Sequence, residues 1–196
     1  MMPRIEIRHT LDAYAARLSL LPAERMQAAV RTLNRTMTTV RAEGARALQK
    51  EYPGLKVGTI KKRMKFVRAT RGKPQAEIVF SGARFSLFHN WRARQTKTGV
   101  RVGKLPYRLE TWDGTPVPLE KLQQAFIQRP TSNRGRWNVY QRMGRERYPI
   151  QGVVAPGLAR AFVERGIRAS LSRLARQRFA IVFQQEAKFR LSKRAG

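Results

Sequence analysis

The chain has 196 residues, of which 42% are hydrophobic, so it can bury a core of ordinary size and is not a disordered basic tail. It has 41 Lys and Arg residues against 12 Asp and Glu residues, a formal net charge of +29. It contains no Cys, which excludes disulfides, thiolate catalysis and Cys-based zinc sites. Charge of this size repels itself unless it is compensated, so the composition predicts a polyanion or an acidic partner.

Positive charge is concentrated in one part of the sequence. Residues 56–104 contain 14 basic residues and one acidic residue, a net of +13, whereas the rest of the chain has a net of +16. Arg accounts for 30 of the 41 basic residues, and its planar fork of donors suits phosphates and protein interfaces. No stretch approaches the roughly 18 consecutive apolar residues of a membrane-spanning helix, and the N-terminus lacks the apolar core of a signal peptide. We therefore expect no membrane partner.

A long helix is predicted over residues 22–52. Pro22 suits a first helical turn, and apolar residues recur at alternating steps of four and three, namely Met26, Val30, Leu33, Met37 and Val40. This stripe is either the core of the chain or a subunit interface, and the core is favoured. Its continuation through Gly44 and Ala47 has small side chains, which allow another element to approach closely.

Shorter elements are predicted on both sides of this helix. They are a short strand around Ile5 and Ile7, short helices at 10–20 and 57–63, strands at 65–70, 75–81, 85–88, 99–102, 125–129 and 137–142, a loop at 130–136, and helices at 157–165 and 170–191. Helix, strands and helix in this order predict an α+β fold with a long N-terminal helix, a central and mostly antiparallel sheet with long loops, and C-terminal helices. We expect one domain over residues 1–196, divided into an arm at 1–20, the long helix, a basic strand-rich region at 56–155 and C-terminal helices at 156–191.

The sequence contains no recognisable catalytic, cofactor-binding or metal-binding constellation. His9 and His89 are 80 positions apart and lack the spacing of a metal motif. Glu110 and Asp113 are the only close acidic pair in the middle of the chain, and their segment is interpreted as an exposed turn. We therefore expect a protein that is not an enzyme and that needs neither a cofactor nor a metal.

Basic clusters are the most informative feature of the sequence. Three of them are predicted to face DNA or another polyanion: Lys61, Lys62, Arg63 and Lys65; Arg92, Arg94, Lys97, Arg101 and Lys104; and Arg134 and Arg136. The alternative is a solvated face, which the net charge disfavours. Phe85, Phe88 and Trp91 lie among these cations and suit either base stacking or core packing, of which core packing is favoured.

Three segments of the sequence resemble the prophage minor tail protein Z family. They are TLNRTMTTVRAEGARALQKEYPGLKVGTIKKRM (32–64), FSLFHNWRARQTKTGVRVG (85–103) and ERYPIQGVVAPGLARAF (146–162). The first is similar to the family's long helix and short basic helix, and the second to its central strand region. In the third, a Pro-Ile pair leads into a C-terminal helix that begins with Pro, as in that family.

The resemblance implies a tail-completion protein of a long-tailed phage or prophage, with a fold like that of neck proteins. Such a protein is assembled in the host cytoplasm and lies in the virion at the head-proximal end of the tail, where it helps to join the tail to the filled head. The resemblance also implies a ring, commonly of six subunits, that contacts the tail tube or tail terminator, head–neck proteins and packaged double-stranded DNA. The alternative is an architectural protein that binds nucleic acid without sequence specificity, with affinity that falls steeply as salt rises.

Overall fold

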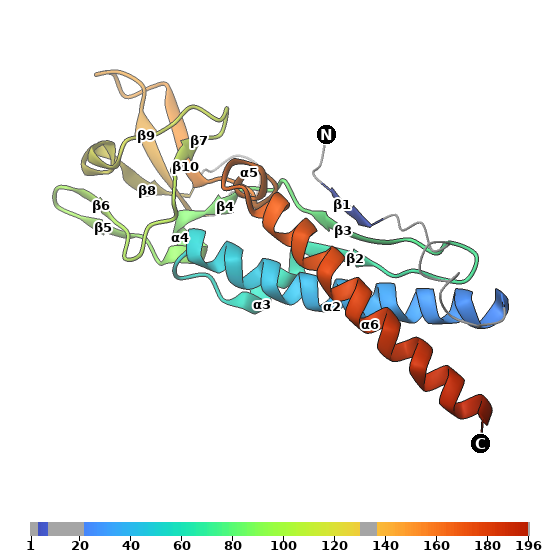
Figure 1. Ribbon diagram of the computed structural model, residues 1–196. Coiled ribbons are helices and arrows are strands. Elements are labelled where there is room, and N and C mark those ends of the chain that lie inside the picture. The colour runs from blue at the N-terminus through green and yellow to red at the C-terminus, as the bar shows by residue number, and fades with distance from the viewer. Residues whose placement is uncertain (1–3, 8–21, 130–136, 196) are drawn as a thin grey trace. The chain divides into compact units, whose positions relative to one another are not determined.

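The computed structural model describes residues 4–7, 22–129 and 137–195 (Figure 1). Its contacts divide the chain into two compact units. Unit 1 comprises Met1–Ala47, Lys61–Ser81 and Phe162–Gly196, and unit 2 comprises Leu48–Ile60 and Gly82–Ala161. The structure combines helices with sheets in which every strand pair of the described residues is antiparallel, which confirms the α+β class. The helix predicted at 10–20 and the loop predicted at 130–136 lie outside the described residues.

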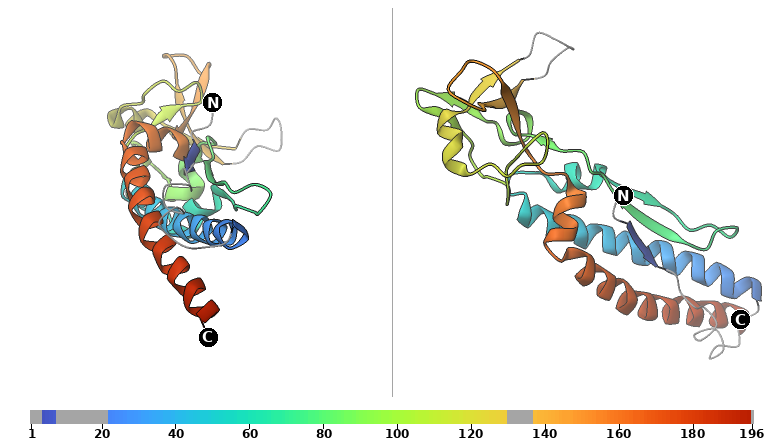
Figure 2. Two further views of the ribbon diagram at one scale, coloured as in Figure 1. Left: turned by 45° about the vertical axis from the view of Figure 1, so that its right-hand side comes forward. Right: turned by 90° about the horizontal axis from the view of Figure 1, so that it is seen from above.

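Unit 1 is built on two long antiparallel helices, which lie side by side in Figure 2. They are α2 (Pro22–Glu51), whose last turn belongs to unit 2, and α6 (Ile167–Ala195). A Cβ atom added to Gly44 would lie 2.8 Å from Cδ1 of Leu171, so this glycine permits close contact between the two helices. Nearer their other ends, Nη1 of Arg31 lies 3.3 Å from Oε1 of Glu186.

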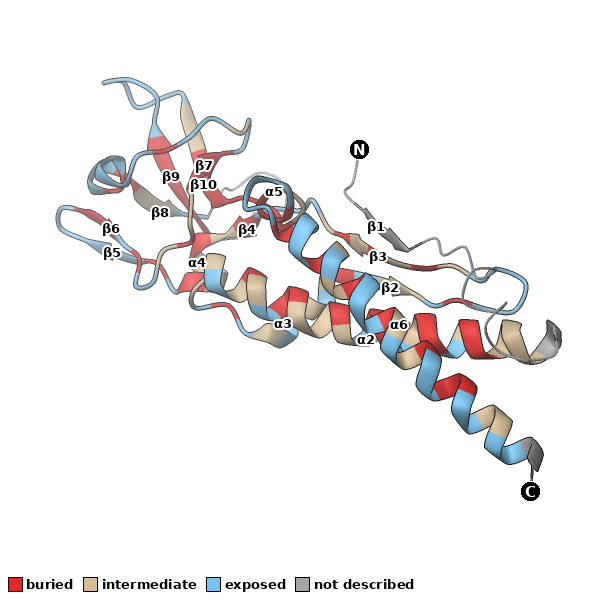
Figure 3. Ribbon diagram, in the orientation of Figure 1, coloured by how far each residue is buried: buried red, intermediate tan, exposed pale blue. Residues whose placement is uncertain are grey.

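The apolar face of α2 lies against the core of unit 1. Leu33, Met37 and Val40 are buried, and Met26 and Val30 are half-buried. On α6, four buried residues recur at intervals of four: Leu171, Ala175, Phe179 and Phe183. Figure 3 shows buried segments of this helix alternating with exposed and intermediate ones. The helix begins at Ile167, three residues before its predicted start, directly after Gly166 with a φ of +63°.

A three-stranded antiparallel sheet completes unit 1. Its order is β1-β3-β2, from β1 (Arg4–Ile7), β3 (Ala76–Phe80) and β2 (Met64–Val67). The strand predicted at 65–70 ends early because the Asn34 side chain forms hydrogen bonds with both the backbone N–H and the backbone C=O of Ala69. Its Nδ2 donates to Ala69 O at 3.0 Å, and its Oδ1 accepts from Ala69 N at 2.9 Å.

Unit 2 contains a five-stranded antiparallel sheet and a separate two-stranded hairpin. The strands of the sheet are β4 (Phe85–Ser86), β7 (Glu110–Thr111), β8 (Phe126–Gln128), β9 (Asn138–Arg142) and β10 (Ile150–Ala155). Their order is β4-β10-β9-β8, and β7 also pairs with β10. The hairpin consists of β5 (Arg94–Thr96) and β6 (Gly99–Arg101). The helical segments are α4 (Leu87–Trp91), the 3-10 helix η1 (Leu119–Gln124), α3 (Val57–Lys62) and α5 (Leu158–Glu164), of which the last two extend past the boundary between units.

The prediction of a strand at 85–88 is wrong for its second half, because α4 begins directly after Ser86. The Ser86 side chain caps this helix by accepting from the backbone N of His89 at 3.5 Å. Arg92, with a φ of +51°, ends the helix. Phe85 and Trp91 are buried and pack with their ring centres 6.0 Å apart, so these two aromatic residues belong to the core, as favoured above. Each helix in the described part of the chain is too short or too polar to cross a membrane.

Candidate polyanion-binding surface

The β5–β6 hairpin presents arginines from both of its strands on one face. Arg94 is directly opposite Arg101, and Gln95 is directly opposite Val100. Because neighbours in a strand point to opposite faces, the buried Val100 places the two arginines on the other, exposed face. Like charges at directly opposite positions destabilise a strand pair. An anion bound across the pair would remove that repulsion.

The tip of the hairpin is held firmly against η1. Gly99 has a φ of +129°, and a Cβ atom there would lie 2.3 Å from the carbonyl O of Gln123, so only glycine fits. The Gln95 side chain donates to Gly99 O at 3.0 Å and accepts from the backbone N of Ile127 at 2.8 Å. These contacts fix the turn that contains Lys97, whose side chain is exposed.

The predicted basic residues fall into different units. Arg92, Arg94, Lys97, Arg101 and Lys104 belong to unit 2, and all five are exposed. Lys61, Lys62, Arg63 and Lys65 belong to unit 1, where Lys62 and Lys65 are exposed and the other two are half-buried. Burial lowers the pKa of Arg63 from its ordinary value. Arg134 and Arg136 lie outside the described residues.

The cations of the hairpin have no acidic partners among the described residues. No carboxylate there lies within 4.0 Å of Arg94, Lys97 or Arg101. Several of the acidic residues instead bind arginines elsewhere, and Glu186 pairs with both Arg31 and Arg190 in unit 1. Within the described part of the chain, the positive charge of the hairpin is therefore uncompensated.

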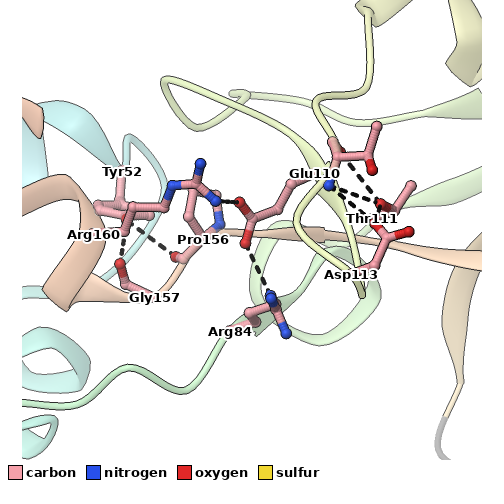
Figure 4. Close-up of polar contacts among 9 residues, drawn as sticks. Tyr52, Arg84, Glu110, Thr111, Asp113, Pro156, Gly157 and Arg160 are labelled. Atoms are coloured by element: carbon pink, nitrogen blue, oxygen red, sulfur yellow. Dashed lines mark hydrogen bonds and ion pairs between the residues drawn. The ribbon is translucent and has the colours of Figure 1, made fainter. Parts of the chain in front are cut away.

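Glu110 is the buried centre of an ion-pair cluster, so the prediction that it lies in an exposed turn is wrong. Its side chain is only 2% exposed because β7 pairs with β10 and is covered within unit 2. Oε1 lies 2.9 Å from Nε of Arg84, and Oε2 lies 2.6 Å from Nη1 of Arg160 (Figure 4). Both carboxylate oxygens are thus occupied by guanidinium groups, which makes this a structural cluster.

Asp113, three residues further on, remains at the surface in the tight turn after β7. Its carboxylate accepts hydrogen bonds from the side chain of Thr111, the backbone N of Thr115 and the side chain of Gln151. These bonds, of which that from Thr111 has the largest effect, hold the pKa of Asp113 well below its ordinary value. No group of three or more His, Asp or Glu side chains that could hold a metal ion occurs in the described ranges.

Comparison with protein families identifies the kind of protein. A family model described as prophage minor tail protein Z (GPZ) matches residues 11–194, nearly the whole chain. No curated protein and no solved structure matches the chain significantly. The match makes the chain a structural protein of a phage tail, and thus a component of the virion. In particular, the chain belongs to the prophage minor tail protein Z family, as the three segments quoted above indicated.

Proposed function

We propose that this minor tail protein is a tail-completion protein, located at the head-proximal end of the tail, where it helps to join the tail to the filled head. Membership of the minor tail protein Z family supports a tail position. The observation that favours the end next to the packaged DNA is the β5–β6 hairpin, whose exposed cations have no acidic partner among the described residues.

The charge of the chain also suits a ring around DNA. We infer a ring of copies, six by analogy with other neck and tail-completion proteins, between the tail tube or tail terminator and head–neck proteins. Subunits of net charge +29 repel one another when they are brought together. Double-stranded DNA has about one negative charge per 1.7 Å of its axis, so DNA in the lumen would neutralise this repulsion.

The proposal is tested by deleting the gene from a phage or prophage and examining the lysate by electron microscopy. We expect filled heads beside tails of normal length that are unjoined, or joined particles that are not infectious. Supplying the intact gene in trans should restore infectious particles. Normal infectious particles from the deletion strain would overturn the proposal and favour the alternative of a DNA-binding protein that acts elsewhere.

A matched pair of variants tests whether the hairpin takes part. One has Arg94→Glu with Arg101→Glu, and the control has Arg173→Glu with Arg176→Glu on the exposed face of α6. Both reduce the net charge by the same amount. We expect the control to restore infectivity in the deletion strain and the hairpin variant to fail. Equal restoration by both would exclude the hairpin from the joining function.

A further inference from the structure

A basic groove lies beside the hairpin in unit 2, and most of its cations belong to none of the clusters found in the sequence. It has a volume of about 520 Å³, and its lining residues come from the hairpin tip, η1, β8 and the end of β9. Its lining includes the side chains of Lys97, Gln123, Gln124, Phe126, Arg142 and Arg145. A smaller groove of about 260 Å³ shares Gln124, Arg142 and Arg145 with it and adds Lys121.

The lining of the two grooves is rich in hydrogen-bond donors and contains no carboxylate. Lys97, Lys121, Arg142 and Arg145 supply positive charge, and glutamine side chains supply amide N–H donors. None of the four cations lies within 4.0 Å of an acidic side chain in the described part of the chain. The grooves therefore suit an anion that accepts several hydrogen bonds.

Arg142 is positioned by an aromatic stack. Its guanidinium carbon lies 5.8 Å from the centre of the Phe126 ring, within the range of a cation–π contact. Phe126 is stacked on Tyr140 with ring centres 6.2 Å apart. Trp112 packs edge-on against Tyr140 with ring centres 5.7 Å apart. A guanidinium held against a ring loses less freedom when it binds a phosphate than one that moves freely in solvent.

The density of charge distinguishes two possible partners, DNA and an acidic protein segment. Together, the hairpin and the grooves contain six cations without acidic partners among the described residues: Arg94, Lys97, Arg101, Lys121, Arg142 and Arg145. An extended peptide has at most one charge per residue, or about one per 3.3 Å. Duplex DNA has about one charge per 1.7 Å of axis, roughly twice that density. A cluster of this kind is better matched by the denser polyanion.

We propose that the groove beside the β5–β6 hairpin binds the phosphodiester backbone of double-stranded DNA, with Lys97, Arg142 and Arg145 in contact with phosphates. The inference rests on the proposed function, because it specifies which polyanion the basic surface meets. The glutamine side chains orient the backbone, and no contact depends on base identity. Binding is therefore independent of sequence and depends strongly on salt.

The test is the affinity of the purified full-length protein for a fluorescein-labelled 30-bp duplex, measured by anisotropy over a range of salt concentrations. The groove variant is Arg142→Gln with Arg145→Gln, and the control is Arg173→Gln with Arg176→Gln on α6, which loses the same charge. Each neutralised phosphate contributes a factor of about fivefold in affinity at 0.15 M salt. We expect the groove variant to bind the duplex about 30-fold more weakly. The slope of log K against log salt, which is negative, should become shallower by about 2.

The control variant should bind within about threefold of the unmodified protein, because Arg173 and Arg176 belong to unit 1 and line neither groove. Equal losses in the two variants would overturn the groove and leave only non-specific attraction to net charge. A poly-glutamate chain that displaces the duplex at equal charge concentration would also overturn the proposal and favour an acidic protein partner. The thermal melt checks that each variant is folded. A second pair, Lys97→Gln with Lys121→Gln, repeats the test if the first variant is unstable.

The two proposals fail in different experiments. Binding of a duplex by the purified protein does not depend on where the protein lies in the virion, so it tests the groove alone. The micrographs of the deletion strain test the tail-completion role alone. Unjoined heads and tails together with a groove variant of normal affinity would refute the groove while leaving the tail-completion role in place.

Discussion

Replacing Glu110 by Gln should destabilise unit 2 by about 2 kcal/mol. Removing one partner of a fully buried ion pair costs about 3–5 kcal/mol, because the remaining charge is left without a partner. Here the side chains of Arg84 and Arg160 are 41% and 38% exposed, so water partly solvates both guanidinium groups and the cost is reduced. Gln also keeps one oxygen that accepts a hydrogen bond.

Urea unfolding followed by tryptophan fluorescence measures this loss in the right part of the molecule. Trp91, Trp112 and Trp137 all belong to unit 2, so their emission reports on the unit that contains Glu110. With a slope of about 2 kcal/mol per M urea, the expected shift of the midpoint is about 1 M.

A matched control is Glu43→Gln. It removes a pair with Arg46 in which the arginine and glutamate side chains are 66% and 41% exposed, and it should cost less than about 0.5 kcal/mol. Because Glu43 lies in unit 1, its effect is followed by circular dichroism at 222 nm. Midpoint shifts of equal size for the two variants would refute the idea that burial makes the Glu110 cluster important.

Three further predictions concern stability. Gly44→Val should cost about 1–3 kcal/mol by overpacking against Leu171, whereas Gly58→Ala, which meets open space, should be neutral or slightly stabilising in a thermal melt. Asp113→Asn should lower the urea midpoint at pH 7, and the difference from the unmodified protein should shrink below about pH 4. Because the pKa of Asp113 is depressed in the folded state, its carboxylate stabilises the folded protein above its ordinary pKa and loses this effect as the pH falls. A difference that persists unchanged at pH 3 would contradict the hydrogen-bond explanation. Tyr52→Phe should cost about 1 kcal/mol by chemical denaturation, because the buried hydroxyl donates to backbone carbonyls at 3.0 and 3.2 Å.

Local signals were sufficient to predict the elements that have clear periodicity and clear ends. The helix α2 was predicted to within one residue, because Pro22 marks its start and Pro53 with Gly54 follows its end. The strand β3 was predicted from the alternation of Ala76, Ile78 and Phe80, all of which are buried. In both cases the information lies within the element itself.

Features that depend on distant parts of the chain could not be predicted. The partners of Glu110 are 26 and 50 positions away from it in the sequence, so no nearby residue indicates that its carboxylate is buried and paired. Helix α4 has five residues, too few to show a helical period. The groove brings Lys97 together with Arg142 and Arg145 through the packing of the hairpin and η1, whereas the hairpin cations were found because they are neighbours in the sequence.

The few acidic residues are used in a way that strengthens the case for an external polyanion. Glu110 and Glu186 each bind two arginines inside one unit, so these carboxylates stabilise the fold and cannot also neutralise the exposed cations. An Arg-rich chain that needed only to balance its own charge would place acidic residues beside Arg94 and Arg101, because these like charges are directly opposite each other in a strand pair. The described structure instead leaves that face uncompensated. The repulsion between Arg94 and Arg101 therefore remains in the free protein, as is expected if a dense anion neutralises these arginines after assembly.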